Sequence, residues 1–148
     1  MADKDAVMAS EQVLQVPFVY SAGPVASRFL IGLRDERKVY GQKCLPCRKV
    51  HVPARARCGW CGEALTEWVE VGPMGTLMNF TVVHYSEPVH PAAAPFVIGV
   101  VRLDGADTCL VHVVRAEPET LKVGLRVQPQ WARERRGHVL DLEAYLPA

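Results

Sequence analysis

Two Cys-x-x-Cys motifs, at Cys44 and Cys47 and again at Cys58 and Cys61, are separated by ten residues and constrain this chain more than any other feature. A spacing of two residues lets both sulfurs of a motif converge on one point, and four thiolates can close a tetrahedron around zinc. A closed tetrahedron has no open position, which is typical of structural metal centres. The motifs therefore predict a structural zinc ribbon with these four cysteines as ligands.

Other uses of paired cysteines fit less well, although iron remains open. An iron centre of the rubredoxin type uses the same ligands, and the softness of thiolate does not exclude it. A redox-active Cys-x-x-Cys requires a strand-to-helix setting that neither motif has. Disulfides require an oxidising compartment, whereas the first residues carry acids in place of the basic start and apolar stretch of a signal peptide. We expect an unexported, cytoplasmic protein, and no apolar run suggests contact with a membrane.

Positive charge is concentrated in residues 28–58, where nine Lys or Arg face two acids, a net of +7 in a chain whose total is +1. Such a local excess indicates a single anionic contact. A solvated face would carry the same excess, and so would a segment that compensates a zinc tetrathiolate, whose own net charge is −2. Arg28 and Arg34 are the candidate anion-binding residues, because they lie on the polar side of a predicted helix and far in sequence from the metal ligands.

The hydrophobic pattern predicts a mainly β protein with one N-terminal helix. Residues up to Gln15 have no clear period and are expected to form a tail or one short helix, whereas residues 24–35 show helical spacing behind Pro24. After the cysteines the period becomes two, and a five-stranded antiparallel barrel of the OB type fits best. We expect its strands near residues 78–82, 96–103, 109–114, 123–131 and 140–146, with one earlier strand at 68–71 if that segment pairs. The expected division is 1–37 for the tail and helix, 38–65 for the ribbon and 66–148 for the barrel.

No catalytic set can be assembled from the sequence. His84 and His90 flank the long loop 85–95, while His112 and His138 fall on a predicted strand and a predicted turn. Cys109 alternates with valines and is expected to be a buried small hydrophobe. We therefore predict no catalytic residues, and a chain that binds a partner or cofactor.

The order of these features resembles the family of OB-fold proteins with a rubredoxin-like zinc ribbon that accompany acyl-CoA enzymes. The resemblance covers residues 17–147 and depends on the ribbon followed by Gly-Thr-Leu-Met-Asn-Phe-Thr-Val-Val-His at 75–84 and Val-Gly-Leu-Arg-Val at 123–127. One departure is Arg48, where the family usually has Gly, and it predicts a first turn that is tighter or differently bonded.

The resemblance implies a non-catalytic subunit of a hetero-oligomer, most often bound to a thiolase-type catalytic subunit and sometimes to a hydratase or aldolase that acts on acyl-CoA. It also implies coenzyme A at the partner interface. Residues 17–23 and 27–30 are similar to small subunits of the benzoylsuccinyl-CoA thiolase of anaerobic toluene breakdown. The alternative is a nucleic-acid-binding protein, since zinc ribbons and OB barrels both occur in that class. Residues 59–148, which include the barrel, have a net charge of −4 and few aromatic side chains, and this disfavours nucleic acid as the partner.

Overall fold

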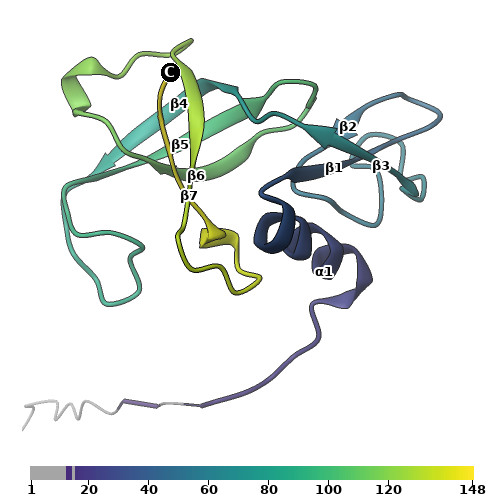
Figure 1. Ribbon diagram of the computed structural model, residues 1–148, viewed down its shortest axis with the longest axis horizontal. Helices are drawn as coiled ribbons and strands as arrows, with labels where there is room; N and C mark the ends of the chain where they lie inside the picture. Colours follow the sequence, from purple (N-terminus) through teal and green to yellow (C-terminus); the bar gives the residue numbers. More distant parts are fainter. Residues whose placement is uncertain (1–12, 15) are drawn as a thin grey trace, which may run out of the picture.

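A short helix, a three-stranded sheet and a five-stranded barrel follow one another along the chain in the computed structural model (Figure 1). The structure describes residues 13–14 and 16–148, so most of the tail expected up to Gln15 lies outside the described residues. Among these residues, no helix has the length and apolar character needed to cross a membrane. The mainly β class predicted from the sequence is confirmed.

Helix α1, Gly23–Ile31, begins with Pro24 in its first turn and continues into a π-helical turn, Gly32–Glu36. Together they cover the segment in which the helix was predicted. Phe29 and Leu33 are buried on one side of this unit, as the helical spacing of apolar residues requires. Gly32 is needed for close packing, because a Cβ there would lie 2.5 Å from the Tyr40 ring.

The ribbon contains an antiparallel sheet in the order β2-β1-β3, formed by β1 (Val39–Lys43), β2 (Val50–His51) and β3 (Glu67–Val71). Strand β3 corresponds to the early strand expected at 68–71. It pairs with β1 along the whole length of that strand, from Val39 opposite Val71 to Lys43 opposite Glu67. The early strand therefore completes the ribbon sheet and lies outside the closed barrel.

The barrel closes in the order β4-β5-β6-β8-β7, with β4 also paired to β7. This confirms the predicted five-stranded OB-type barrel, with one difference. Strands β6 and β8 run parallel where they meet, because β8 returns between β6 and β7. The strands are β4 (Gly75–Val83), β5 (Phe96–Leu103), β6 (Leu110–Val114), β7 (Arg126–Trp131) and β8 (Leu142–Pro147), with 3-10 turns at Pro118–Thr120 and Val139–Asp141.

Two strands depart from the expected alternation of inward and outward side chains. In β4 a bulge between Leu77 and Asn79 shifts the register, so Leu77 is fully buried before the bulge and Phe80 packs on the core after it. In β6 the inward residues include Leu110 and His112, while Val111 is 62% exposed. Cys109 precedes β6 and is only partly buried, so the expectation of a buried cysteine was wrong.

One hydrophobic core connects the helix, the ribbon and the barrel. Phe29 and Leu33 from the helical segment and Val39, Val52 and Val71 from the ribbon belong to the same buried cluster as the barrel residues. The three predicted segments are therefore packed together through shared apolar contacts.

Candidate metal centre

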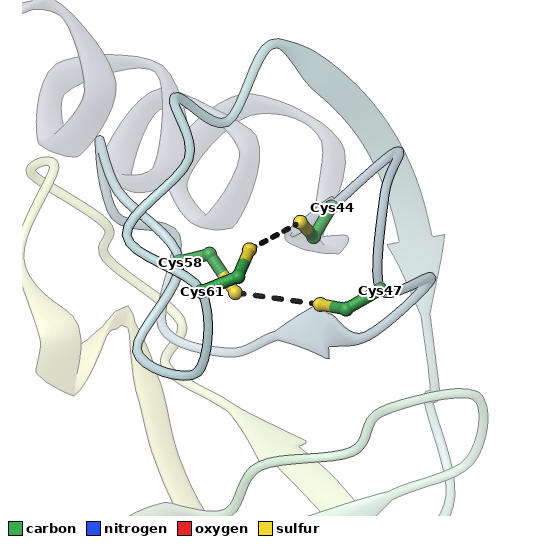
Figure 2. A group of neighbouring side chains, drawn as sticks. All are labelled: Cys44, Cys47, Cys58 and Cys61. Carbon is green, nitrogen blue, oxygen red and sulfur yellow. Dashed lines mark hydrogen bonds between the residues drawn. The ribbon is translucent and has the colours of Figure 1, made fainter.

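The four cysteine sulfurs converge at one point beside the ribbon sheet (Figure 2). All four Sγ atoms lie within 4.8 Å of one another. The Cys44 and Cys61 sulfurs are 3.5 Å apart, as are those of Cys47 and Cys58. Sulfurs bound to one zinc at about 2.3 Å would be separated by about 3.8 Å, whereas a disulfide requires about 2.05 Å. The arrangement can hold a four-coordinate metal ion, and these pairs are not disulfides.

The two cysteine knuckles share one backbone hydrogen bond and the sign of one φ angle. The amide of Cys44 donates to the carbonyl of Lys49 at 2.8 Å, and the amide of Cys58 donates to that of Glu63 at 2.8 Å. In each knuckle the residue after the second cysteine has a positive φ, which is 60° for Arg48 and 75° for Gly62. In the second knuckle the Gly62 amide also donates to the Cys58 carbonyl at 3.1 Å, and no equivalent bond joins Arg48 to Cys44. The first turn is therefore bonded differently, and Arg48 adopts the left-handed conformation that glycine accepts more easily.

The protein environment distinguishes two of the sulfurs electrostatically. Burial opposes ionisation of Cys58, but the backbone N–H groups of Cys61 and Trp60, the His51 ring and the Cys47 thiol outweigh it and lower its pKa to about 5. For Cys44 the backbone N–H of Cys47 favours the thiolate, yet burial and the neighbouring thiols outweigh that bond and raise its pKa to about 12. Negative charge is therefore best accommodated on Cys58 before any metal binds.

His51 is a residue of this centre that the sequence did not identify. Its side chain is 0% exposed, and its Nε2 lies 3.3 Å from the Cys58 sulfur. The ring also packs beside Trp60, with centroids 5.0 Å apart. The only sequence signal was a histidine between two valines in the spacer that joins the motifs.

The two arginines predicted to meet an anion lie on the helical segment, each with a partner from the chain. The guanidinium of Arg28 lies 4.4 Å above the centre of the Trp68 ring. Arg34 donates to the Asp35 carboxylate at 2.8 Å, and this bond lowers the pKa of Asp35. The carbonyl of Arg34 in turn accepts from Arg135 Nε at 2.7 Å.

The remaining histidines have separate positions in the described part of the chain and form no shared site there. His84 is exposed, and His90 Nδ1 accepts from the Glu87 amide at 3.2 Å. The ring of His112 bonds to the carbonyl of Leu142, and its burial lowers the pKa. His138 caps the turn Val139–Asp141 by accepting from the Leu140 amide at 3.1 Å.

A hollow of about 350 Å³ lies where the long loop meets one end of the barrel. Its lining combines loop residues with the start of β5 and the end of β6, including Ala92, Pro95, Phe96, Val114 and Pro118. Such a position is where small barrels commonly bind other molecules.

Comparison with known proteins gives a family match for the segment from β3 to the end of β7. Residues 68–132 match the family described as "ChsH2, C-terminal OB-fold domain". A protein of Methanocaldococcus jannaschii is 24% identical over 102 residues, which cover 68% of this chain and 72% of the relative. A protein of Methanothermobacter thermautotrophicus is 25% identical over 89 residues, which cover 60% and 67%. Both relatives are called DUF35 domain-containing scaffold proteins.

Two solved structures share the fold. A DUF35-family protein from Sulfolobus solfataricus has a TM-score of 0.60 and 25% identity, over 72% of this chain and 78% of that one. A chain of the Ltp2-ChsH2(DUF35) aldolase has a TM-score of 0.62 and 22% identity, over 86% and 98%. These likenesses confirm the predicted resemblance at the level of the fold: residues 68–132 match the ChsH2 C-terminal OB-fold family, and the chain is similar to proteins called DUF35 domain-containing scaffold proteins.

Proposed function

We propose that this DUF35-type chain is a non-catalytic, zinc-binding scaffold subunit of a heteromeric acyl-CoA thiolase, in which it stabilises the catalytic subunit. The observation that carries the proposal is the closed set of four cysteine sulfurs, which suits a structural ion and leaves no position for substrate. Two relatives are called scaffold proteins, and one structure of the same fold is part of an aldolase with a second named component. The similarity at residues 17–23 and 27–30 makes benzoylsuccinyl-CoA the proposed substrate of the complex.

The metal in this proposal is zinc, bound by Cys44, Cys47, Cys58 and Cys61. The apolar contacts around the knuckles are few, since the local buried cluster contains only Leu65 besides the cysteines. A segment with so small a core needs another source of folding free energy, and a structural zinc supplies it. The metal therefore stabilises the ribbon and takes no part in the reaction of the complex.

The proposed docking surface for the catalytic subunit is the apolar arm, which we define as residues 16–20. The arm precedes α1 and runs away from the rest of the molecule (Figure 1). Phe18, Val19 and Tyr20 are 73%, 100% and 77% exposed. Adjacent exposed apolar side chains of this kind mark protein contact sites. The loop 85–95 adds Tyr85 and Val89, which are also exposed, as a second contact.

Arg28 and Arg34 are proposed to meet an anion at the partner interface, either the phosphates of coenzyme A or an acidic surface of the catalytic subunit. Both side chains lie on the helical segment, and a guanidinium can donate to two oxygens at once. If replacing both with glutamate leaves partner affinity and the KM for coenzyme A unchanged, the two arginines are only a solvated surface.

The complex is tested by co-expressing the chain with candidate thiolase-type subunits and purifying the lone chain, the lone partner and the pair. We expect coenzyme A-dependent cleavage from the pair and none from the lone chain, because a thiolase needs an activated cysteine with a base and an oxyanion hole. Replacing Phe18 and Val19 with serine should weaken the pair, whereas the matched control Val111→Ser, at an exposed barrel position, should not. Turnover by the lone chain, or full turnover and stability of the partner without it, would overturn the proposal.

A further inference from the structure

His51 connects the two cysteine knuckles. It lies in β2, which follows the first knuckle, yet its Nε2 reaches the sulfur of Cys58 in the second knuckle at 3.3 Å. The backbone N–H of Trp60 donates to the same sulfur at 3.4 Å. Cys58 therefore receives a side-chain contact from one half of the centre and a backbone contact from the other.

The residues on both sides of His51 are bonded to the barrel. The amide of Val50 donates to the Asp107 carboxylate at 2.9 Å, and its carbonyl accepts from the Asp107 amide at 2.9 Å. The amide of Val52 donates to the Thr108 hydroxyl at 2.6 Å, and that hydroxyl donates to the Val52 carbonyl at 2.7 Å. Asp107 and Thr108 belong to the hairpin between β5 and β6, so the barrel holds the backbone that carries His51.

We propose that His51 is a positioning residue of the metal centre, and that it transmits the position of the barrel hairpin to the Cys58 sulfur. The proposal rests on the metal binding proposed above and on no particular partner enzyme. A neutral imidazole has one donor and one acceptor nitrogen, and a metal-bound thiolate can only accept. Nε2 therefore carries the proton and donates to Cys58. Nδ1 has no hydrogen-bond partner among the described residues, so no competing bond there sets a different tautomer.

An N–H···S bond of this kind orients the thiolate and withdraws part of its charge. Hydrogen-bonding partners of metal ligands typically change metal affinity by about 10–100-fold when they are removed. In an iron-loaded centre, hydrogen bonds to sulfur also raise the reduction potential. The full burial of His51 and its contact with Trp60 restrict the ring to this orientation.

The test compares zinc affinity in the full-length chain, measured by competition with a chromophoric chelator. We expect His51→Leu, which lacks a donor, to raise the zinc Kd by about 10–100-fold. His51→Gln, whose amide nitrogen can reach the position of Nε2, should recover most of that loss. Thr108→Val, which removes the hydroxyl bonds from the hairpin, should raise the Kd by a smaller factor. His84→Gln, at an exposed loop histidine, is the matched control and should leave the Kd unchanged.

A second measurement separates positioning from simple packing. The iron-loaded forms of His51→Leu and Thr108→Val should have lower reduction potentials than the wild type, because the bond to sulfur is lost or misdirected. Lower thermal stability with unchanged zinc affinity and unchanged potential would make His51 a core residue and overturn the proposal. If His51→Leu does not fold, the same two readouts on Thr108→Val decide. A wild-type chain that binds no metal would instead refute the metal proposal on which this one rests.

Discussion

The ribbon and the barrel are joined in one chain but are stabilised by different physical means. Around its knuckles the ribbon buries little apart from the cysteines and Leu65, and its β2 strand is only two residues long. The barrel closes its own hydrogen-bonded sheet around large buried side chains such as Leu77, Leu103 and Leu142. From this difference we expect the ribbon to depend on the proposed metal and on the barrel hairpin, and the barrel to depend on burial of apolar surface.

Removing one metal ligand should produce the largest difference in stability between the ribbon and the barrel. Cys58→Ser is expected to abolish metal binding and to unfold roughly residues 38–62, because structural zinc contributes about 10–16 kcal/mol of binding free energy in small zinc domains. Amide hydrogen exchange should show lost protection in the ribbon and retained protection in β4–β8. Cys109→Ser, outside the cluster, is the control. No zinc or iron in wild-type protein purified without chelator, or a ribbon that stays folded in the variant, would contradict the prediction.

A cavity in the barrel core should have the opposite effect: it should lower the free energy of unfolding and leave zinc affinity nearly unchanged. Leu77 is fully buried in the core, and Leu77→Ala is expected to lower the free energy of unfolding by about 2–5 kcal/mol. Zinc affinity of the folded variant should stay close to that of the wild type, because Leu77 lies outside the buried cluster of the cysteines. Urea unfolding and chelator competition measure the two quantities. Equal losses in both would show that barrel and ribbon form one energetic unit.

Replacing Arg48 with glycine should stabilise the ribbon. The left-handed conformation at Arg48, with φ of 60°, costs a residue with a side chain about 1–2 kcal/mol, and glycine avoids most of that cost. We expect Arg48→Gly to raise ribbon stability by about 1 kcal/mol, measured by chelator-induced unfolding. Arg55→Gly supplies the contrast, because Arg55 has an ordinary φ, and it should be neutral or destabilising. A loss of stability in Arg48→Gly would show that the arginine side chain matters more than the backbone strain.

Low pH should weaken the contact between the ribbon and the barrel hairpin at Asp107. This is the smallest of the expected effects on stability. The Lys49 ammonium and then the Val50 amide bond to Asp107 and lower its pKa below the usual value of 3.8. A lowered pKa in the folded state means that this stabilisation is present above the unfolded pKa and is lost as pH falls through the folded pKa. With a partly exposed carboxylate, we expect Asp107→Asn to cost about 0.5–1 kcal/mol at neutral pH and to reduce the acid dependence below pH of about 4. An unchanged acid profile in titrations of the variant would assign the effect to other carboxylates.

The features that the sequence determined depend on local spacing. Four cysteines in two short motifs can converge wherever the chain folds. The nearly continuous apolar run of Phe96–Leu103 likewise predicts the buried strand β5. Helix α1 was likewise recognisable from Pro24 and its helical spacing. Each of these patterns extends over a few residues and can be recognised without knowing which other segment packs against it.

Other features were decided by segments that are distant in the sequence. Strand β3 belongs to the ribbon sheet because it pairs with β1, a segment more than twenty residues earlier in the chain. The bulge after Leu77 likewise depends on how β4 pairs with β5. His51 had no local signal, because its role arises from a sulfur in the other knuckle and from a hairpin more than fifty residues away. The spacing of apolar residues within one helix or strand follows from local backbone geometry. Strand partners, register and buried polar contacts depend on how distant segments pack together in the folded chain.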